Sequence, residues 1–308
     1  MAETVQTIFP AMGTLNTITV FDGHRTEVDA AREYTLGLDR RLSVFRPDSE
    51  LSRLNILGGG KWMTVSEDTF EIFLTGVFCS ELAGGAFDIT AGPLAALWKD
   101  AIREKRLPDE AEILNRKALV DYRDISLDWE QHRVRLEKDC QSVDFGGIAK
   151  GYVADKLTRM LSEAGVKEAV INLGGTVGVM GSPHWIGIQD PLRPTGEALG
   201  MLRLENAFAV TSGWYERGFD LNGVRYHNII DPRTGYPSRS GLLSVTLVGE
   251  RAAELDALAT AVFILGAEKA LPILHNRNIQ ATFVTETGEV FLTPGLRKSF
   301  QILYRKGA

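Results

Sequence analysis

The stretch from Asp144 to Gly151 reads DFGGIAKG, and an amphipathic segment from Tyr152 to Ala164 follows it at once and ends at Gly165. Apolar residues at helical spacing before a terminal glycine predict a helix over residues 152–164. A short apolar segment, Glu168 to Leu173 (EAVINL), then predicts a strand that runs into Gly174-Gly175. A glycine-rich turn, a helix and a buried strand therefore form the centre of the predicted fold.

Strands and helices are mixed irregularly on both sides of this centre. Hydrophobic periodicity predicts helices over Glu27 to Arg41, Thr69 to Leu82, and Ala252 to Leu265, the last closed by Gly266. The same patterns predict strands at Thr14 to Val20, His184 to Gln189, Leu202 to Val210, Ser244 to Val248, Ile279 to Val284 and Glu289 to Leu292. Because strict βαβ alternation is missing, we expect an α+β or mixed α/β fold rather than a doubly wound sheet.

The composition is that of an ordinary globular protein. The chain has 308 residues, of which 44% are hydrophobic and 24% charged, and its mean hydropathy is -0.05. This length allows one large domain or two closely packed subdomains, and no Pro/Gly/Ser-rich linker marks a boundary. A net charge of -6 and a pI near 5.5 provide no global positive field, which disfavours nucleic acid and anionic lipid as partners.

The chain ends and the cysteines give few signals. No apolar run reaches the ~20 residues that cross a bilayer, so we expect no transmembrane segment. The start, Met1 to Gln6, has neither a basic nor an apolar region typical of a signal peptide. We therefore expect a cytoplasmic protein as the sequence stands, or an extracytoplasmic one if a leader has been removed. Cys79 and Cys140 lack metal-ligand spacing and are expected to be small buried hydrophobic residues.

Three glycine-rich stretches are candidate ligand sites. Gly84 to Pro93 could let a ligand approach the backbone, with Asp88 as an acceptor, or could be a tight turn between two helices. Asp144 to Gly151 precedes a helix, whose N-terminus favours phosphate, and Lys150 adds a positive charge; a capping turn with a solvated lysine is the alternative. Ile171 to Gly175 ends a strand and suits either a ligand crevice or a plain turn.

A fourth stretch is richer in polar groups. Thr211 to Arg217 and Tyr226 to Pro237 contain hydroxyls, a histidine, an amide, carboxylates and arginines. Downstream, Asp256 and Thr260 are spaced i and i+4, so on a helix both oxygens face one side. A hard cation prefers such oxygen ligands. Helix capping by Asp256 and packing by Thr260 is the competing interpretation.

Taken in order, these stretches resemble the family of FAD:protein FMN transferases, formerly grouped as thiamine-biosynthesis lipoproteins. The similarity covers residues 11 to about 260. It is carried by Ala11 to Thr14, Ser43 to Phe45, Ser49 to Asn55, Gly85 to Thr90, Asp144 to Gly151, Ile171 to Gly175, Ile188 to Pro191, Thr211 to Gly213, Ile229 to Gly235 and Asp256 to Thr260.

The resemblance implies a T-fold-like α+β architecture, with an antiparallel sheet and packed helices, in a single flavin-transferase domain over residues 1–308. It implies FAD contacts at Met12, Phe45, Ala86, Phe87, Asp88, Asp144, Lys150, Asn228 and Ile230. The family's Mg²⁺ is held by a backbone carbonyl near Gly147, by the side chains of Asp256 and Thr260, and by the Ala259 carbonyl.

The implied reaction is Mg²⁺-dependent transfer of FMN from FAD to a Thr or Ser hydroxyl of an acceptor protein, with AMP as the leaving group. The implied acceptors are flavoprotein subunits of redox complexes and fumarate-reductase-type enzymes. An FAD pyrophosphatase that releases FMN and AMP, and an FAD-binding protein without turnover, are the alternative functions.

One position departs from the family pattern. The family usually has His immediately before Ile-Ile-Asp-Pro, and here that position is Asn228. His227 is adjacent, but neighbours in an extended segment point to opposite faces. An amide can hydrogen-bond a ligand but cannot accept a proton near neutral pH. The sequence therefore assigns no catalytic base.

Overall fold

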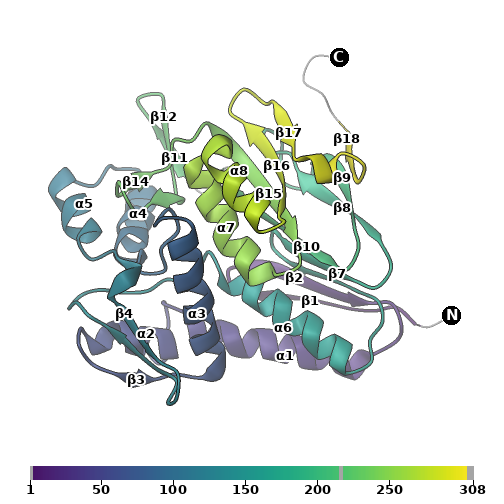
Figure 1. Ribbon diagram of the computed structural model, residues 1–308, viewed down its shortest axis with the longest axis horizontal. Coiled ribbons are helices and arrows are strands. Elements are labelled where there is room, and N and C mark those ends of the chain that lie inside the picture. The colour runs from purple at the N-terminus through teal and green to yellow at the C-terminus, as the bar shows by residue number, and fades with distance from the viewer. Residues whose placement is uncertain (1–2, 215–217, 304–308) are drawn as a thin grey trace.

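A computed structural model describes residues 3–214 and 218–303. Its centre is an eight-stranded antiparallel sheet in the order β1-β2-β6-β7-β10-β15-β16-β17 (Figure 1). The strands are β1 (Val5–Ala11), β2 (Thr14–Val20), β6 (Ala169–Leu173), β7 (Thr176–Met180), β10 (Ala207–Gly213), β15 (Leu242–Gly249), β16 (Gln280–Thr285) and β17 (Val290–Leu292). The β2–β6 pair joins segments far apart in the chain, with Asn16 opposite Leu173.

Helices cover one face of this sheet and enclose the main core. They are α1 (Arg25–Leu42), α3 (Glu67–Leu82), α6 (Ala149–Glu163), α7 (Ala252–Leu265) and α8 (Ala267–Asn276) (Figure 1). All residues of α7 are buried except Thr260 and Leu265, which are partly exposed. A helix that is apolar all round belongs inside a protein, and α7 lies between the sheet, α3 and α6.

A smaller sheet covers part of the opposite face. It has the order β18-β9-β8, with β8 (His184–Gln189), β9 (Ala198–Leu204) and β18 (Phe300–Ile302). A second apolar cluster fills the space between the two sheets, where Ile186, Leu202 and Phe300 pack near Val179 and Ala209. The main sheet is therefore buried on both faces in this region.

The remaining elements surround one end of the helical layer. They are α2 (Glu50–Leu57), α4 (Gly92–Glu104), α5 (Glu110–Lys117), η1 (Tyr122–Asp124), the sheet of β3 (Met63–Thr64), β5 (Arg133–Leu136) and β4 (Ile125–Asp128), and the pairs β11 (Gly218–Leu221) with β12 (Val224–His227) and β13 (Ile230–Asp231) with β14 (Tyr236–Pro237). The short helix η2 (Pro294–Leu296) instead packs against β16 and the smaller sheet. In the described part of the chain, no helix is both long and apolar enough to span a bilayer.

The structure corrects two predictions from the sequence. The single strand predicted over Leu202 to Val210 is wrong, because β9 ends at Leu204 and β10 begins at Ala207. Asn206 between them has φ 45°, a left-handed conformation that breaks a strand and that Asn tolerates well. Cys79 is buried as expected, but Cys140 is exposed, so its expected burial is wrong.

Candidate active site

The glycine-rich turn before α6 is fixed by two neighbouring segments. The side-chain amide of Asn55 accepts from Val143 N at 2.8 Å and donates to Val143 O at 3.0 Å. Asp144 N donates to Ile89 O at 2.9 Å, which places the 86–90 stretch beside the turn. α6 begins at Ala149, three residues earlier than predicted, so Lys150 and Gly151 belong to its first turn.

The first turn of α6 contacts α7 through Asp256. Gly151 N donates to Asp256 Oδ2 at 2.9 Å, and only 5% of Asp256 is exposed. Among the described residues, Asp256 Oδ1 has no hydrogen-bond donor and no cation beside it. A buried carboxylate without a cationic partner is costly. Asp256 therefore caps a helix, as the competing interpretation proposed. It uses only one of its two carboxylate oxygens to do so, and the capped helix is α6, whereas Asp256 itself belongs to α7.

Thr260 lies one turn further along α7 and meets two other candidate stretches. A Cβ placed on Gly147 would lie 3.3 Å from Thr260 Oγ1 and 3.2 Å from the Phe87 ring. Ser212 Oγ, near the end of β10, is 3.5 Å from Thr260 Oγ1. The structure therefore brings Gly147, Asp256 and Thr260 together, with Phe87 and Ser212 at their side.

The turn also presents donors and a charge. Lys150 Nζ donates to Gly146 O at 3.2 Å, so this side chain folds back over the turn. Asp144 Oδ1 accepts from Gly146 N at 2.6 Å. Within the described chain, the backbone N–H groups of Gly147 and Lys150 have no acceptor. Free N–H groups at a helix N-terminus suit an anion.

Asp88 is committed to holding neighbouring backbone. Its Oδ1 accepts from Thr90 N at 2.8 Å and Thr90 Oγ1 at 2.7 Å, and its Oδ2 accepts from Tyr122 N at 2.9 Å. Burial raises the pKa of this carboxyl above its ordinary value, while the hydrogen bonds from Thr90 and Tyr122 oppose the shift. Asp88 also lines a hollow of about 350 Å³ together with Gly84, Gly85 and Arg233.

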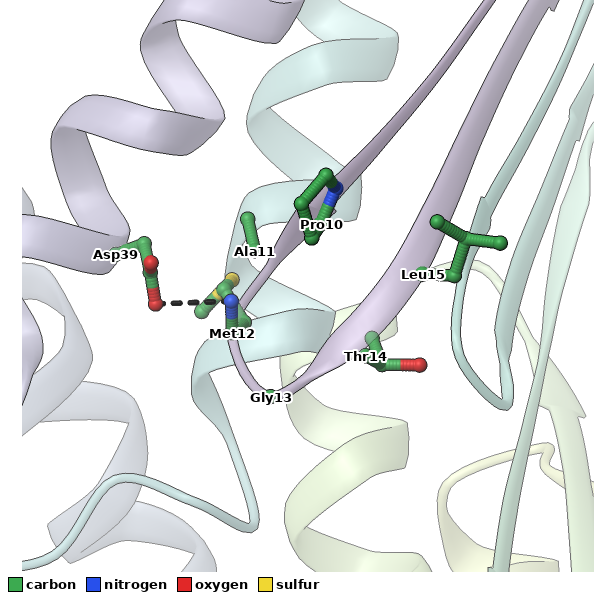
Figure 2. A pocket seen from close by; sticks show the side chains of 7 residues that line it. All are labelled: Pro10, Ala11, Met12, Gly13, Thr14, Leu15 and Asp39. Carbon is green, nitrogen blue, oxygen red and sulfur yellow. Dashed lines mark hydrogen bonds between the residues drawn. The ribbon is translucent and has the colours of Figure 1, made fainter.

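The turn between β1 and β2 forms a second hollow, of about 420 Å³, lined by Pro10 to Leu15 and Asp39 (Figure 2). Met12 has φ 52°, and its N–H donates to Asp39 Oδ1 at 2.8 Å. A Cβ on Gly174, which has φ 62°, would lie 2.2 Å from Thr14 Oγ1, so glycine is needed at this position, where the β1–β2 turn packs on the β6–β7 turn.

The other predicted FAD contacts lie at separate places. Phe45 is 71% exposed, with Lys99 Nζ 3.6 Å from its ring centroid. Ala86 is fully buried, so neither its backbone nor its side chain is exposed to a ligand in this structure. Ile230 packs against Leu94 and Trp98 of α4. Within the described residues, none of these three side chains shares a hydrogen bond or a ring contact with Asp256 or Thr260.

His227 and Asn228 differ sharply. His227 is buried, its Nε2 donates to Ser238 O at 3.0 Å, and its Nδ1 accepts from Ile229 N at 3.2 Å. Burial lowers the pKa of this imidazole to about 4. Asn228 is exposed. Nearby, Asp231 forms two hydrogen bonds to the Arg233 guanidinium. The candidate residues 215–217 lie outside the described residues.

Three residues that support the site were not singled out from the sequence. Asp39 holds the Met12 backbone, Asn55 holds Val143, and Asp155 of α6 accepts from Ala252 N and Ala253 N at 2.8 Å each. Their partners are backbone groups distant in the chain, so no local pattern could identify them. Asn55 lay within a stretch that carried the family resemblance, but without a role.

The fold and the site together define a mixed α+β protein with a glycine-rich, oxygen-lined site where two helices begin. The chain belongs to the ApbE family, whose model matches residues 12–283. It is 36% identical over 264 residues to an FAD:protein FMN transferase of Klebsiella pneumoniae, covering 85% of this chain and 83% of the relative. It is 31% identical over 316 residues to one of Treponema pallidum, covering 95% and 87%.

The solved structures agree. The ApbE protein of Thermotoga maritima superposes with a TM-score of 0.86 at 29% identity, covering 96% of this chain and 99% of that one. The family resemblance and the expected antiparallel sheet with packed helices are therefore confirmed.

Proposed function

We propose that this protein transfers FMN from FAD to a Thr or Ser hydroxyl of an acceptor flavoprotein and releases AMP, with Mg²⁺ at the Asp256 site. Two findings support the reaction: the family match and the relatives named FAD:protein FMN transferase. The observation that carries the site is the buried Asp256 carboxylate, which has one uncommitted oxygen among the described residues and lies beside the first turn of α6.

The donor set fits a hard cation. Asp256 Oδ1, Thr260 Oγ1 and the backbone carbonyls near Gly147 and Ala259 would all supply oxygen atoms to it. No group of three or more His, Cys, Asp or Glu side chains able to hold a metal occurs in residues 3–214 and 218–303. That agrees with Mg²⁺, which usually takes one or two carboxylates plus substrate phosphates rather than an all-protein cage. When bound, Mg²⁺ would neutralise pyrophosphate charge and stabilise the charge of the leaving phosphate.

FAD binding is assigned to residues around the same turn. The free N–H groups of Gly147 and Lys150, the positive end of α6 and the Lys150 ammonium favour the pyrophosphate. Phe87 borders this turn, and the Met12 hollow, Asp144 and the exposed Phe45 are available for the rest of the molecule. Asp88 lines a neighbouring hollow, but its carboxylate already accepts from Thr90 and Tyr122, so it stays a proposed contact on the family pattern. Ala86, Asn228 and Ile230 remain proposed contacts on the family pattern.

In the reaction, the P–O–P bond of FAD breaks and a bond forms between the FMN phosphorus and the acceptor oxygen. AMP leaves with the bridging oxygen, and the acceptor hydroxyl loses its proton. Asn228 cannot take that proton near neutral pH. Asp231 could take the proton only if the two hydrogen bonds that it accepts from the Arg233 guanidinium weakened. The residues of this chain therefore bind, orient and polarise FAD, and we assign removal of the proton from the acceptor hydroxyl to solvent.

We further propose that the chain forms a single flavin-transferase domain. One hydrophobic cluster contains residues from Val5 in β1 to Phe283 in β16, and this shared core supports a single domain. The acceptor would be a flavoprotein subunit of a redox complex or a fumarate-reductase-type enzyme.

The proposed function is tested by incubating the protein with FAD and Mg²⁺, with and without a Thr-containing acceptor protein. We expect AMP release and in-gel flavin fluorescence of the acceptor only when all three are present. Equally rapid AMP release without acceptor would identify a pyrophosphatase, and intact FAD in every mixture would identify a binding protein.

A further inference from the structure

The two helices that form the site cap each other. Neither α6 nor α7 has a capping hydrogen bond from its own N-cap side chain, Ile148 or Arg251. Instead, Asp256 of α7 accepts from Gly151 N of α6 at 2.9 Å. In return, Asp155 of α6 accepts from the first two N–H groups of α7, with Oδ1 to Ala252 N and Oδ2 to Ala253 N, both at 2.8 Å.

These contacts close a ring between the helices. Gly151 and Asp155 are one turn apart on α6, and Ala252 and Asp256 are one turn apart on α7, so each pair lies on one helix face. The helices approach so closely that a Cβ on Gly151 would lie 2.1 Å from Ala252 O. The position of Asp256 relative to α6 is therefore fixed by two sets of hydrogen bonds, one at Gly151 and one at Asp155.

We propose that Asp155 is a positioning residue for the Mg²⁺ site: by capping α7, it fixes the Asp256 carboxylate so that Oδ2 stays on Gly151 and Oδ1 remains available. This inference rests on the proposed function for the Mg²⁺ assignment. Residues that orient a metal ligand characteristically change metal affinity about 10–100-fold when altered. A residue that only caps a helix would change stability instead.

The test is Asp155→Asn, which keeps the size of the side chain. Its Nδ2 is a donor and faces a donor, so at least one of the two bonds to α7 is lost. We expect Mg²⁺ binding, measured by calorimetry with MgCl₂ and the full-length protein, to weaken about 10–100-fold. FAD affinity measured without Mg²⁺ should stay within about twofold of wild type, since Asp155 is not among the proposed FAD contacts.

Glu254→Gln is the matched control. Glu254 lies on α7, two residues before Asp256, and is buried; it pairs with Arg277 at 2.6 and 2.8 Å and with Arg251 at 3.4 Å, and it accepts none of the hydrogen bonds of the ring. We expect this variant to lower the melting temperature while leaving the Mg²⁺ dissociation constant unchanged. If Asp155→Asn lowers only the melting temperature, as the control does, Asp155 is merely a structural cap and the inference is wrong.

Two further variants separate this inference from the proposed function. Asp256→Asn should lose Mg²⁺ binding; if it does so while Asp155→Asn binds normally, only the positioning role fails. If wild type binds no Mg²⁺ with or without FAD, the metal assignment and the positioning role both fail. Asp155→Glu retains the carboxylate on a longer side chain and serves if the Asn variant does not fold. We expect its Mg²⁺ affinity to fall between wild type and Asp155→Asn, and wild-type affinity would contradict the geometric argument.

Discussion

His227 and Asn228 are neighbours in the chain but face different environments: the imidazole is 5% exposed and hydrogen-bonded at both nitrogens, whereas Asn228 is exposed. The sequence-based expectation that His227 cannot replace an imidazole at position 228 is consistent with this geometry. The two residues therefore lead to separate predictions, one about chemistry and one about stability.

Asn228→His should accelerate FMN transfer. An imidazole at this exposed position could assist removal of the acceptor proton, and such assistance contributes typically ~10²–10⁴-fold. FAD affinity should change little, because binding needs no base. Transfer rates near pH 7 on a Thr-containing acceptor, with FAD titrations alongside, test this. If wild type transfers efficiently and the variant is no faster, position 228 has no part in proton removal.

His227 should make the fold acid-sensitive. Burial lowers its pKa from 6.5 to about 4. A folded-state pKa below the unfolded value means that stability is present above about pH 6.5 and is lost as the pH falls towards 4. The full effect amounts to about 3 kcal/mol. Urea unfolding of wild type and His227→Asn at pH 7.5 and 5 should show a smaller pH dependence in the variant, even though the variant is less stable at pH 7.5. Parallel losses would contradict the assignment.

Asp256→Asn should abolish Mg²⁺-dependent AMP release and leave the fold intact. The Asn Oδ1 can still accept from Gly151 N–H, so the cap on α6 survives while the anionic ligand is removed. Circular dichroism should match wild type. Full activity in this variant would return Asp256 to a purely structural role.

Lys150→Ala should weaken FAD binding. A charge-assisted hydrogen bond to phosphate is worth roughly 1.5–3 kcal/mol, which corresponds to about 10–100-fold in affinity. The bond from Lys150 Nζ to Gly146 O shows that the ammonium already lies at the turn, so it needs little reordering to bind. Equal FAD affinity in the variant, by fluorescence titration, would show that this lysine makes no contact.

Gly151→Ala and Gly37→Ala form a matched pair of helical substitutions. A Cβ at Gly151 meets backbone, the Ala252 carbonyl oxygen at 2.1 Å, whereas a Cβ at Gly37 in α1 meets nothing within 4 Å. Overpacking typically costs about 1–3 kcal/mol, while replacing Gly by Ala in an open helix stabilises by about 0.5–1 kcal/mol. Thermal melts should move in opposite directions. Equal shifts would mean that α6 and α7 are not in close contact.

Elements with a strong hydrophobic period were predictable from the sequence. The strand at Thr14 to Val20 and the helix at Ala252 to Leu265 have the predicted bounds. The wrong strand at 202–210 has a physical cause, since the apolar run continues through Asn206 and only the backbone conformation of that residue separates β9 from β10. β1 and β7 gave no separate signal, because they are stabilised by partners in the sheet rather than by local pattern.

The parts of the site that were predictable are those formed by residues close together in the sequence. The i, i+4 spacing of Asp256 and Thr260 placed both on one helix, and the DFGGIAKG turn does begin a helix. The meeting of Gly147 with Thr260, and of Asp155 with α7, depends on how two distant helices pack, which no local spacing encodes. The individual FAD contacts, the acceptor and the compartment stay predictions.

The pairing of β2 with β6, and of α6 with α7, has a consequence for synthesis on the ribosome. When the first half of the chain emerges, β2 has only β1 beside it, and Asn16 still lacks its partner Leu173. Later, α6 can form, but Gly151 and its neighbours remain uncovered until residues 252–260 follow. Contacts of such long sequence separation form late and slowly. A ligand of this site can therefore stabilise only the nearly finished chain, and earlier nascent segments expose apolar surface that chaperones would have to protect.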